Sequence, residues 1–410
     1  MKTIVFIETN KSGSSREAIK AAEELNFFTV LLTGKKRFLE KRSEFPDVHQ
    51  MIFTDIDNYD NLITIINKLK KTGKNIKGIF SFIDSFVYVA ACLSEKFCQS
   101  IVSTEAIYHM NNKILTRNVL KGLPVSLNYL IYKPTESLSS FLKEAKKMNF
   151  PLIVKSPESA GSKDVLLAKD KNQLISSIQT LSKKRPNEKI LLEEYIDGPQ
   201  YLVEVLVHNG KVHIIAVIEQ EITFFERFIV TGYSLLGRVD DRLYYSLLNS
   251  INSVVQAFDM KNGACHLELR RVNRIWKLIE INPRISGGAM NRMIEIGHGI
   301  NLVQETIQLM LGNKPSLKKI RYKYVYTHYL TVDSIGKLIQ VTGKNRSSKY
   351  PCVEEVYIAP KKGNILKPPT SMGHRCGYIL ASSYYKKKAK RMALEAATEI
   401  SFKIEPTYAT

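Results

Sequence analysis

The chain has 410 residues, of which 44% are hydrophobic, 24% charged and 9% aromatic. This is the composition of a folded globular protein, so a disordered or fibrous chain is excluded, and about two to four domains are expected. The formal net charge is +21, and residues 311–410 contribute 19 basic against 6 acidic side chains. We interpret this segment as a Lys-rich solvated surface that also attracts anionic substrates such as nucleotides, since no nucleic-acid-binding signature accompanies it.

The cysteines and the first residues bear on the compartment. Five cysteines without a C-x-x-C pair argue against a disulfide framework or a structural zinc site and favour a reducing, cytoplasmic setting. The first apolar run is too short for a signal peptide. Because no window approaches about 18 uninterrupted apolar residues, we expect no membrane span.

Strands and helices are expected to alternate through the first hundred residues, with strands at Thr3–Glu8, Phe27–Leu32 and Gly78–Ile83 and helices at Arg16–Leu25 and Val87–Phe97. This alternation predicts a parallel α/β sheet. Ligands gather at the carboxyl ends of such strands, where the loop Asn10–Ser15 and Asp84 are placed. Both are candidate site residues, although such residues also simply favour turns.

Further along the chain, helices and strands continue to alternate. The pattern predicts helices at Asn111–Lys121, Lys171–Ser182, Leu243–Phe258, Asn301–Leu311 and Lys386–Ile400. It predicts strands at Phe150–Lys155 and Val165–Ala168, strand-like chain over Ile190–Gln220 with a turn at Asn209–Gly210, and a hairpin over Ala264–Asn282.

The hairpin carries side chains of the kind that bind metals. If its turn is centred on Arg274, Glu268 lies opposite Glu280, and the two-residue period puts Asn282 on the same face as Glu280. Carboxylates that face each other repel unless a cation lies between them, and oxygen ligands suit Mg²⁺. The alternative is a solvated face, or a glutamate paired with Arg270 or Lys277.

Two further groups suit phosphate chemistry. Arg284 follows Asn282 and precedes Ser286-Gly287-Gly288, so its guanidinium can clamp a phosphoryl group that is being transferred. Lys155 ends a strand ahead of the Ser/Gly loop at 159–163, which suits phosphate binding without being a Walker A motif.

The order and spacing of these segments resemble the ATP-grasp superfamily of carboxylate–amine ligases. Five segments carry the likeness: Asn112–Pro124, Phe150–Lys155, Leu192–Gly198, His266–Glu268 with Ile279–Arg284, and Gly299–Val303. Together they cover about residues 1–315. Within the superfamily the chain is most similar to bacterial L-amino-acid ligases, in its length, its C-terminal extension and the Ser-Gly-Gly after Arg284.

The resemblance implies an α/β and α+β architecture in four parts. An N-terminal α/β domain (1–112) would precede an ATP-grasp lid (113–190), a central ATP-grasp domain with the metal site (191–315) and a basic, mixed C-terminal extension (316–410). It also implies the cofactors ATP and Mg²⁺, with Mn²⁺ as an alternative, and amino acids as substrates. A homodimer is compatible with it, whereas membrane and nucleic-acid partners are not expected.

The resemblance also assigns roles to residues. Lys113 and Lys155 would contact ATP phosphates, the lid loop at Gly161 and Ser162 would close over them, and Glu193 and Ile196 would bind adenine through their backbones. Glu268, Glu280 and Asn282 would hold Mg²⁺, while Arg284 would stabilise the phosphoryl transition state. Asp84, His266, Ser286 and Gly287 are placed near the substrate, and Asp84 or His266 is a candidate base for the attacking amine.

The sequence departs from the family pattern at two places. Gln200 stands where a ribose-binding glutamate is common. Val230 and Tyr233 stand near where relatives carry an acidic residue and a histidine that hold substrate. Both departures bear on substrate choice rather than on the ATP chemistry.

The implied reaction joins two amino acids through an acyl phosphate, with release of ADP and phosphate. The alternatives are another ATP-grasp ligase or carboxylase of the biotin or purine-pathway type, and a basic nucleic-acid-binding protein. A Rossmann dehydrogenase is weaker still, because no G-x-G-x-x-G follows the first strand.

Overall fold

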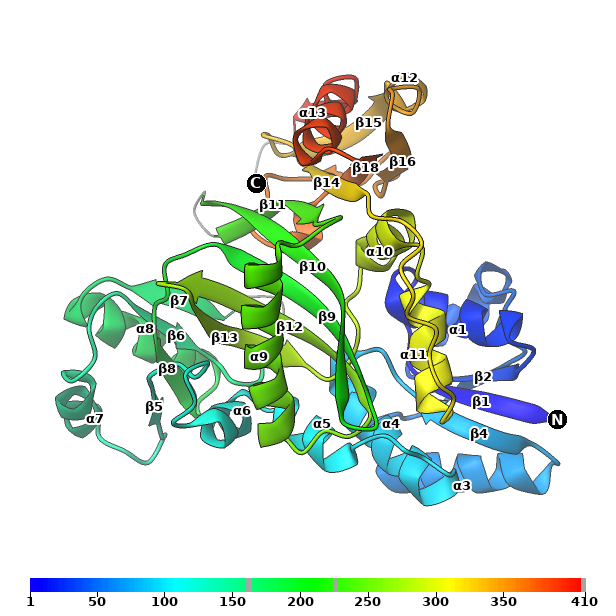
Figure 1. Ribbon diagram of the computed structural model, residues 1–410, viewed down its shortest axis with the longest axis horizontal. Coiled ribbons are helices and arrows are strands. Elements are labelled where there is room, and N and C mark those ends of the chain that lie inside the picture. Colours follow the sequence, from blue (N-terminus) through cyan, green and yellow to red (C-terminus); the bar gives the residue numbers. More distant parts are fainter. Residues whose placement is uncertain (160–163, 225–227, 407–410) are drawn as a thin grey trace.

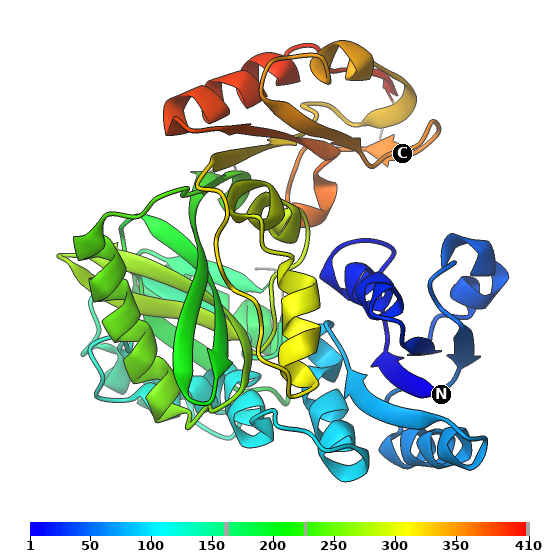
Figure 2. The same cartoon turned by 45° about the vertical axis from the view of Figure 1, so that its right-hand side comes forward.

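The structure is a computed structural model that describes residues 1–159, 164–224 and 228–406. Its strands form four sheets, and the chain runs from an N-terminal unit through a central unit to a C-terminal unit (Figure 1). Figure 2 shows the N-terminal and C-terminal units lying against different sides of the central one. Within these described ranges no helix has the length and apolar character needed to cross a bilayer.

The N-terminal unit is a parallel sheet in the order β3-β2-β1-β4 with helices packed on it. The core strand β1 is almost fully buried from Thr3 to Ile7, as expected for a parallel strand covered on both faces. The predicted α/β alternation is confirmed. Its elements are β1 (Lys2–Ile7), α1 (Ser14–Glu24), β2 (Phe28–Thr33), α2 (Lys36–Glu40), β3 (Gln50–Phe53), α3 (Tyr59–Lys71), β4 (Asn75–Phe80) and α4 (Asp84–Phe97).

The lid is a four-stranded antiparallel sheet in the order β5-β8-β6-β7, reached through two short helices. The sheet continues past the proposed boundary at residue 190, because its inner strand β8 extends to Glu194. The elements are α5 (Thr104–Met110), α6 (Lys113–Leu120), β5 (Tyr129–Tyr132), α7 (Leu138–Ala145), β6 (Leu152–Lys155), β7 (Val165–Ala168), α8 (Lys171–Lys184) and β8 (Ile190–Glu194).

The central unit is built on an eight-stranded sheet in the order β13-β12-β9-β10-β11-β14-β18-β16. Helix α9 packs on one face, and α10 and α11 lie towards the N-terminal unit (Figure 1). The elements before residue 315 are β9 (Gln200–His208), β10 (Lys211–Phe224), β11 (Phe228–Leu235), α9 (Asp241–Ala257), β12 (Gly263–Val272), β13 (Ile275–Asn282), α10 (Met290–His298) and α11 (Leu302–Met310).

The C-terminal unit continues this sheet. Strand β14 pairs with β11, so the predicted division at residue 316 separates two parts of one hydrogen-bonded sheet. The predicted mixture of short strands and a basic helix is confirmed, with one additional short helix. The elements are β14 (Tyr324–Leu330), β15 (Gly336–Thr342), α12 (Lys344–Ser347), β16 (Val353–Ile358), β17 (Ile365–Leu366), β18 (Gly377–Ser383), α13 (Lys386–Ala397) and β19 (Ser401–Pro406).

Part of the excess positive charge of this segment is neutralised within the fold. Lys386 and Lys390 of α13 form ion pairs with Glu219 and Glu221 of β10. The basic helix therefore docks against the central sheet through complementary charge.

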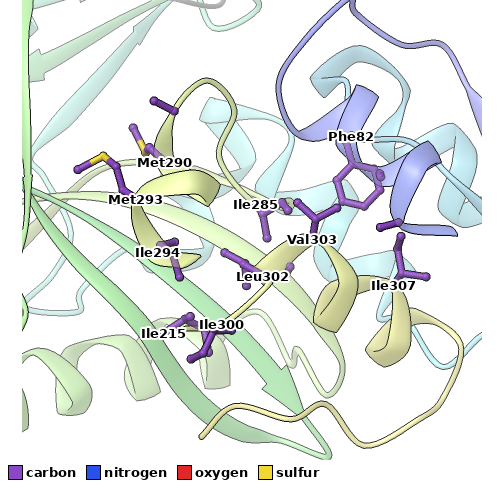
Figure 3. Packing of buried hydrophobic residues seen from close by; sticks show 14 of the residues in the cluster. Phe82, Ile215, Ile285, Met290, Met293, Ile294, Ile300, Leu302, Val303 and Ile307 are labelled. Atoms are coloured by element: carbon purple, nitrogen blue, oxygen red, sulfur yellow. The ribbon is translucent and has the colours of Figure 1, made fainter. Parts of the chain in front are cut away.

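The N-terminal and central units share one hydrophobic core. Phe82, just after β4, packs with Val303 and Ile307 of α11, and Ile285 lies beside Val303 (Figure 3). All four side chains are at most 5% exposed. Each Å² of apolar surface buried contributes about 25 cal/mol, so this shared core stabilises the contact between the two units. The end of β4 is thereby fixed beside the chain that follows β13.

Candidate functional site

The β12–β13 hairpin brings the predicted metal ligands together. Asn273 and Arg274 both have positive φ angles, 49° and 68°, as a two-residue type I′ turn requires. The turn is therefore centred between these two residues and not on Arg274. A β-bulge between the pairs Leu269–Leu278 and Glu268–Glu280 leaves Ile279 unpaired and shifts the register by one residue. Glu268 consequently lies opposite Glu280, as predicted.

The oxygen atoms of this cluster have neighbours that orient them. Gln200 Nε2 donates to Glu268 Oε2 at 3.0 Å, and Asn282 Nδ2 lies 3.3 Å from Glu280 Oε1. Arg270 and Lys277, the alternative partners, instead donate to other groups: to Gln200 and a backbone carbonyl, and to the carbonyl of Ser126. The glutamates are thus not engaged by these two cations.

This donor set fits a hard divalent cation. Two carboxylates and one amide oxygen are the ligands that Mg²⁺ prefers, and water and phosphate usually complete its coordination shell. In the described ranges no group of three or more His, Cys, Asp and Glu side chains is placed to hold a metal. A cation here would therefore have few protein ligands, which is the usual situation for a metal that also binds a nucleotide.

A pocket between the lid sheet and the central sheet adjoins these carboxylates. Apolar walls from Leu127, Ile153, Val165, Ile222 and Val230 enclose it. Seven of the predicted residues line it: Lys113, Lys155, Glu193, Ile196, Gln200, Glu268 and Glu280. A pocket that combines apolar walls with cations and carboxylates suits a nucleotide with its phosphates and metal.

A buried ion network lies on the lid side of the pocket. Lys155 Nζ donates to Glu193 Oε2 at 2.7 Å, and Arg117 Nε donates to Glu193 Oε1 at 2.6 Å. Burial opposes ionisation of Glu193, yet the charges of Arg117 and Lys155 hold its pKa below the usual range. Burial lowers the pKa of Lys155, and Glu193 opposes that effect. Lys155 and Arg117 therefore share one buried carboxylate on this side of the pocket.

Arg117 was not predicted as a site residue. It is 2% exposed, lies on the buried face of α6, and its Nη2 donates to the Ile279 carbonyl at 2.6 Å. Among the residues that the structure describes, its Nη1 is buried without a hydrogen-bond partner. The sequence indicates it only weakly: Arg117 lies on the same face of the helix as Leu120, which is buried.

The predicted adenine contacts need one correction. Glu193 lies inside β8, paired with Tyr129 on one side and Ile153 on the other, so it does not offer a free strand edge. Its carboxylate instead pairs with Arg117 and Lys155. Ile196 follows β8 and lines the pocket, and its carbonyl accepts a hydrogen bond from Arg270.

Lys113 reaches the lid loop from the first turn of α6. The Asn112 side chain caps this helix by accepting from the amides of Ile114 and Leu115. Lys113 Nζ donates to the carbonyl of Ser159 at 2.7 Å, just before the predicted loop residues. Gly161 and Ser162 themselves lie outside the described residues.

Arg284 and Asp84 meet across the domain junction. The Arg284 guanidinium donates from Nε and Nη2 to the two oxygens of Asp84, at 2.5 and 2.7 Å. Asp84 begins α4, at the carboxyl edge of the N-terminal sheet, where sequence reasoning placed it. The Arg284 side chain is 17% exposed and that of Asp84 is 40% exposed. This bidentate pair holds the predicted transition-state arginine in one orientation.

His266, Ser286 and Gly287 form a second buried group. His266 Nδ1 lies 2.6 Å from Glu204 Oε1, and the Ser286 amide donates to Glu204 Oε2 at 3.1 Å. Burial favours neutral His266, but Glu204 outweighs it and raises the pKa of His266 to about 10. Gly287 packs near Ser14 at the start of α1.

Glu204 was not predicted as a site residue, yet it connects this group. It is fully buried in β9, directly opposite His266 of β12. His266 Nε2 also lies 3.8 Å from Glu268 Oε1. Contacts therefore connect the predicted metal ligand Glu268, through His266 and Glu204, to Ser286 in the loop after Arg284. The sequence pattern that indicates a functional role for Glu204 is a single carboxylate within the apolar run Tyr201–Val207.

Comparison with known proteins agrees with this geometry. Three family models match the chain: an ATP-grasp N-terminal domain at residues 19–97, an ATP-grasp domain at 148–292, and the L-amino acid ligase C-terminal domain 2 at 328–405. Together they fall on the N-terminal unit, the nucleotide pocket and the C-terminal unit.

Relatives and solved structures point in the same direction. An L-arginine-specific L-amino acid ligase of Bacillus subtilis is 22% identical over 77% of this chain and 77% of its own length. Dapdiamide A synthase of Enterobacter agglomerans is 23% identical over 93% of this chain and 91% of its own. The crystal structure of an L-amino acid ligase from Bacillus licheniformis superposes with a TM-score of 0.82 at 17% identity and covers 99% of both chains.

The fold is shared more widely. Phosphoribosylglycinamide synthetase from Anaerococcus prevotii superposes with a TM-score of 0.76 at 16% identity, over 99% of this chain and all of that one. The family model that matches the C-terminal unit is that of the L-amino acid ligases. The chain belongs to the ATP-grasp superfamily of carboxylate–amine ligases and carries the C-terminal domain of the L-amino acid ligases.

Proposed function

We propose that the protein joins the carboxylate of one amino acid to the amine of another, with ATP converted to ADP and phosphate. The observation that carries this proposal is the pocket between the two sheets, which is lined by the carboxylates of Glu268 and Glu280 and by the cations Lys113 and Lys155. The L-amino acid ligase C-terminal domain supports amino acids as the substrates.

The residues of the pocket divide the work of phosphoryl transfer. Lys113 and Lys155 would hold phosphate oxygens, and Arg284 would offset the charge that develops on the transferred group. Glu268, Glu280 and Asn282 would hold Mg²⁺, which would supply charge neutralisation for the phosphates. Asp84 keeps the Arg284 guanidinium oriented.

Activation is needed because oxide is a poor leaving group. Transfer of the γ-phosphoryl group to the carboxylate gives an acyl phosphate. The amine nitrogen then forms the C–N bond while the C–O bond to phosphate breaks, phosphate takes the electron pair, and the nitrogen releases a proton. Closure of the lid over the pocket would exclude water from the acyl phosphate.

The test is a screen of amino-acid pairs with ATP and Mg²⁺, in which phosphate release and the mass of the product are both measured. We expect at least one pair to give a dipeptide in amounts that equal the phosphate released. Phosphate release that requires bicarbonate or a phosphoribosyl amine instead would assign the chain to another ATP-grasp reaction.

The matched variants are Glu280→Gln and Glu219→Gln. Glu280→Gln removes a predicted metal ligand, so we expect dipeptide formation to fall by about a hundredfold or more. Glu219→Gln changes a carboxylate on the same central sheet that pairs with Lys386 outside the pocket, and activity should be retained. Full activity of Glu280→Gln would refute the assigned metal site.

A further inference from the structure

A second cleft lies where the three units of the molecule meet. Its lining comes from the start of α1, from the loop after Arg284 and from the C-terminal unit, and includes Glu17, Gly288, Tyr329, Tyr357 and Arg375. Gly13 and Gly288 approach so closely that a Cβ on Gly13 would lie 3.2 Å from the Gly288 amide nitrogen. A Cβ on Gly288 would meet no described atom within 4 Å, so this backbone borders open space.

Arg375 is the cation of this cleft. Its guanidinium carbon lies 3.7 Å from the centre of the Tyr329 ring. A guanidinium held on an aromatic face keeps its plane fixed, and its donors lie in that plane. Such an arginine suits a carboxylate ligand, which it can bind with two parallel hydrogen bonds.

Tyrosines wall the cleft beside this arginine. Tyr378 contacts both Tyr329 and Tyr357, with ring centres 6.3 and 5.2 Å apart, and its hydroxyl donates to Glu355 at 2.8 Å. Tyr357 is 41% exposed, whereas Tyr329 is 7% exposed. The wall is thus rigid at its base and open at its rim.

The cleft borders the loop that follows Arg284, through Gly288. Tyr233 of β11 is buried next to Tyr329 of the cleft wall. Its ring centre lies 5.6 Å from that of Tyr329. Gly288 follows Arg284 by only four residues. A ligand in the cleft would therefore contact the same loop that carries Arg284.

Glu17 supplies the opposite charge. Among the described residues that line the cleft, it is the one carboxylate. Its Oε2 accepts a hydrogen bond from Asn291 Nδ2 at 3.2 Å, which fixes the side chain. A ligand that carries a carboxylate for Arg375 and an ammonium group for Glu17 would match both charges, and an amino acid zwitterion has this pair of groups.

We propose that this cleft binds the amine-donating amino acid, with its α-carboxylate on Arg375 and its amino group towards Glu17. The proposal rests on the ligase function proposed above and deepens it. The acceptor is the substrate whose carboxylate is not activated, and burial of that charge requires a cation. The C-terminal unit therefore completes the active site through Arg375.

The test compares an acceptor amino acid with its α-carboxamide, at saturating ATP and acyl donor. Wild-type enzyme should prefer the free carboxylate by about ten- to a hundredfold in kcat/KM, the value of a charge-assisted hydrogen bond. In Arg375→Gln the KM for the amino acid should rise by that factor with kcat changed little, and the preference should disappear. Arg375→Lys should restore part of it.

Arg346→Gln is the matched control, since Arg346 lies in the same unit and pairs with Glu399 away from the cleft. It should keep the wild-type preference. A second measurement, the shift in Tm that each acceptor produces, reports binding without catalysis. The amino acid should raise the Tm of wild type and of Arg346→Gln but not of Arg375→Gln, and the amide should have little effect on any of them.

The outcomes separate this proposal from the proposed function. Equal losses for amino acid and amide in Arg375→Gln, or an unchanged preference, would overturn the role of Arg375. If no pair of amino acids is ligated, the proposed reaction fails. The cleft assignment then stands only if an amino acid raises the Tm through Arg375, and it falls if none does.

Discussion

At the scale of single residues, Glu193 holds the lid side of the pocket together. It is 2% exposed and accepts hydrogen bonds from both Lys155 and Arg117. Glu193→Gln would leave two buried cations without their counter-ion, so we expect the free energy of unfolding to fall by about 3–5 kcal/mol. Chemical denaturation measures this change.

Glu194→Gln provides the control at the next position. Glu194 hydrogen-bonds the amide and side chain of Asn128, and no buried cation depends on it. Its substitution should change stability by no more than about 0.5 kcal/mol. Because bound phosphate can neutralise the two cations, saturating ATP should recover part of the loss in Glu193→Gln. Equal stability of the two variants would contradict this account of the network.

The sequence predicted some members of this network and missed others for a physical reason. Lys155 was expected because it ends an apolar strand before a Ser/Gly loop. Arg117 and Glu204 were not expected, because their partners, Glu193 and His266, are 76 and 62 residues away along the chain. Local patterns identify a charged residue in an apolar run but not the residue that compensates its charge.

At the scale of elements, the β12–β13 hairpin combines a strained turn with a bulge. Arg274 has a φ of 68°, where a side chain costs about 1 kcal/mol that glycine avoids. Arg274→Gly should therefore raise the free energy of unfolding by about 0.5–1 kcal/mol, less the entropy cost of glycine. Activity should not change, because the register at Glu268 and Glu280 is preserved. Denaturant titration with a parallel activity assay tests both expectations.

Arg274→Ala separates backbone strain from the loss of the arginine side chain. Alanine keeps a Cβ and therefore the strain, so this variant should show no gain in stability. A gain of the same size for alanine and glycine would attribute the effect to the removed side chain rather than to the turn.

The hairpin also shows how a correct pairing can be predicted from an incorrect turn. Alternation of side chains placed Glu268 opposite Glu280 on the assumption of a turn at Arg274. The actual turn shifts the register by one residue, and the bulge at Ile279 shifts it back. The bulge is fixed by Arg117, which binds the carbonyl of Ile279 from another unit, and no pattern within the hairpin indicates it.

At the scale of the whole molecule, the division into domains was the least predictable feature. The lid needs β8 as its central strand, and β14 extends the central sheet into the C-terminal unit. Strand pairing over such distances depends on which edges are left open in three dimensions. The composition of the chain near residues 190 and 316 does not record it, whereas the order of motifs was enough to predict the family.

The junction of the N-terminal and central units leads to the last prediction. Asp84 and Arg284 lie 200 residues apart in the chain and form two hydrogen bonds across this junction. The shared apolar core around Phe82 holds the units together without this pair. Asp84→Asn should therefore leave the fold intact but release the guanidinium from its bidentate partner.

We expect ligase activity in Asp84→Asn to fall by about ten- to a hundredfold, because a misdirected Arg284 no longer meets the transferred phosphoryl group. Binding of ATP, measured by the Tm shift it causes, should be unchanged, since Asp84 does not line the nucleotide pocket.

Asp60→Asn is the control: Asp60 also lies in the first turn of an N-terminal helix, α3, but is exposed to solvent. If Asp84→Asn keeps full activity, or loses ATP binding along with it, the pair does not act by orienting Arg284. Activity that returns in Asp84→Glu would show that a carboxylate at this junction is what the arginine requires.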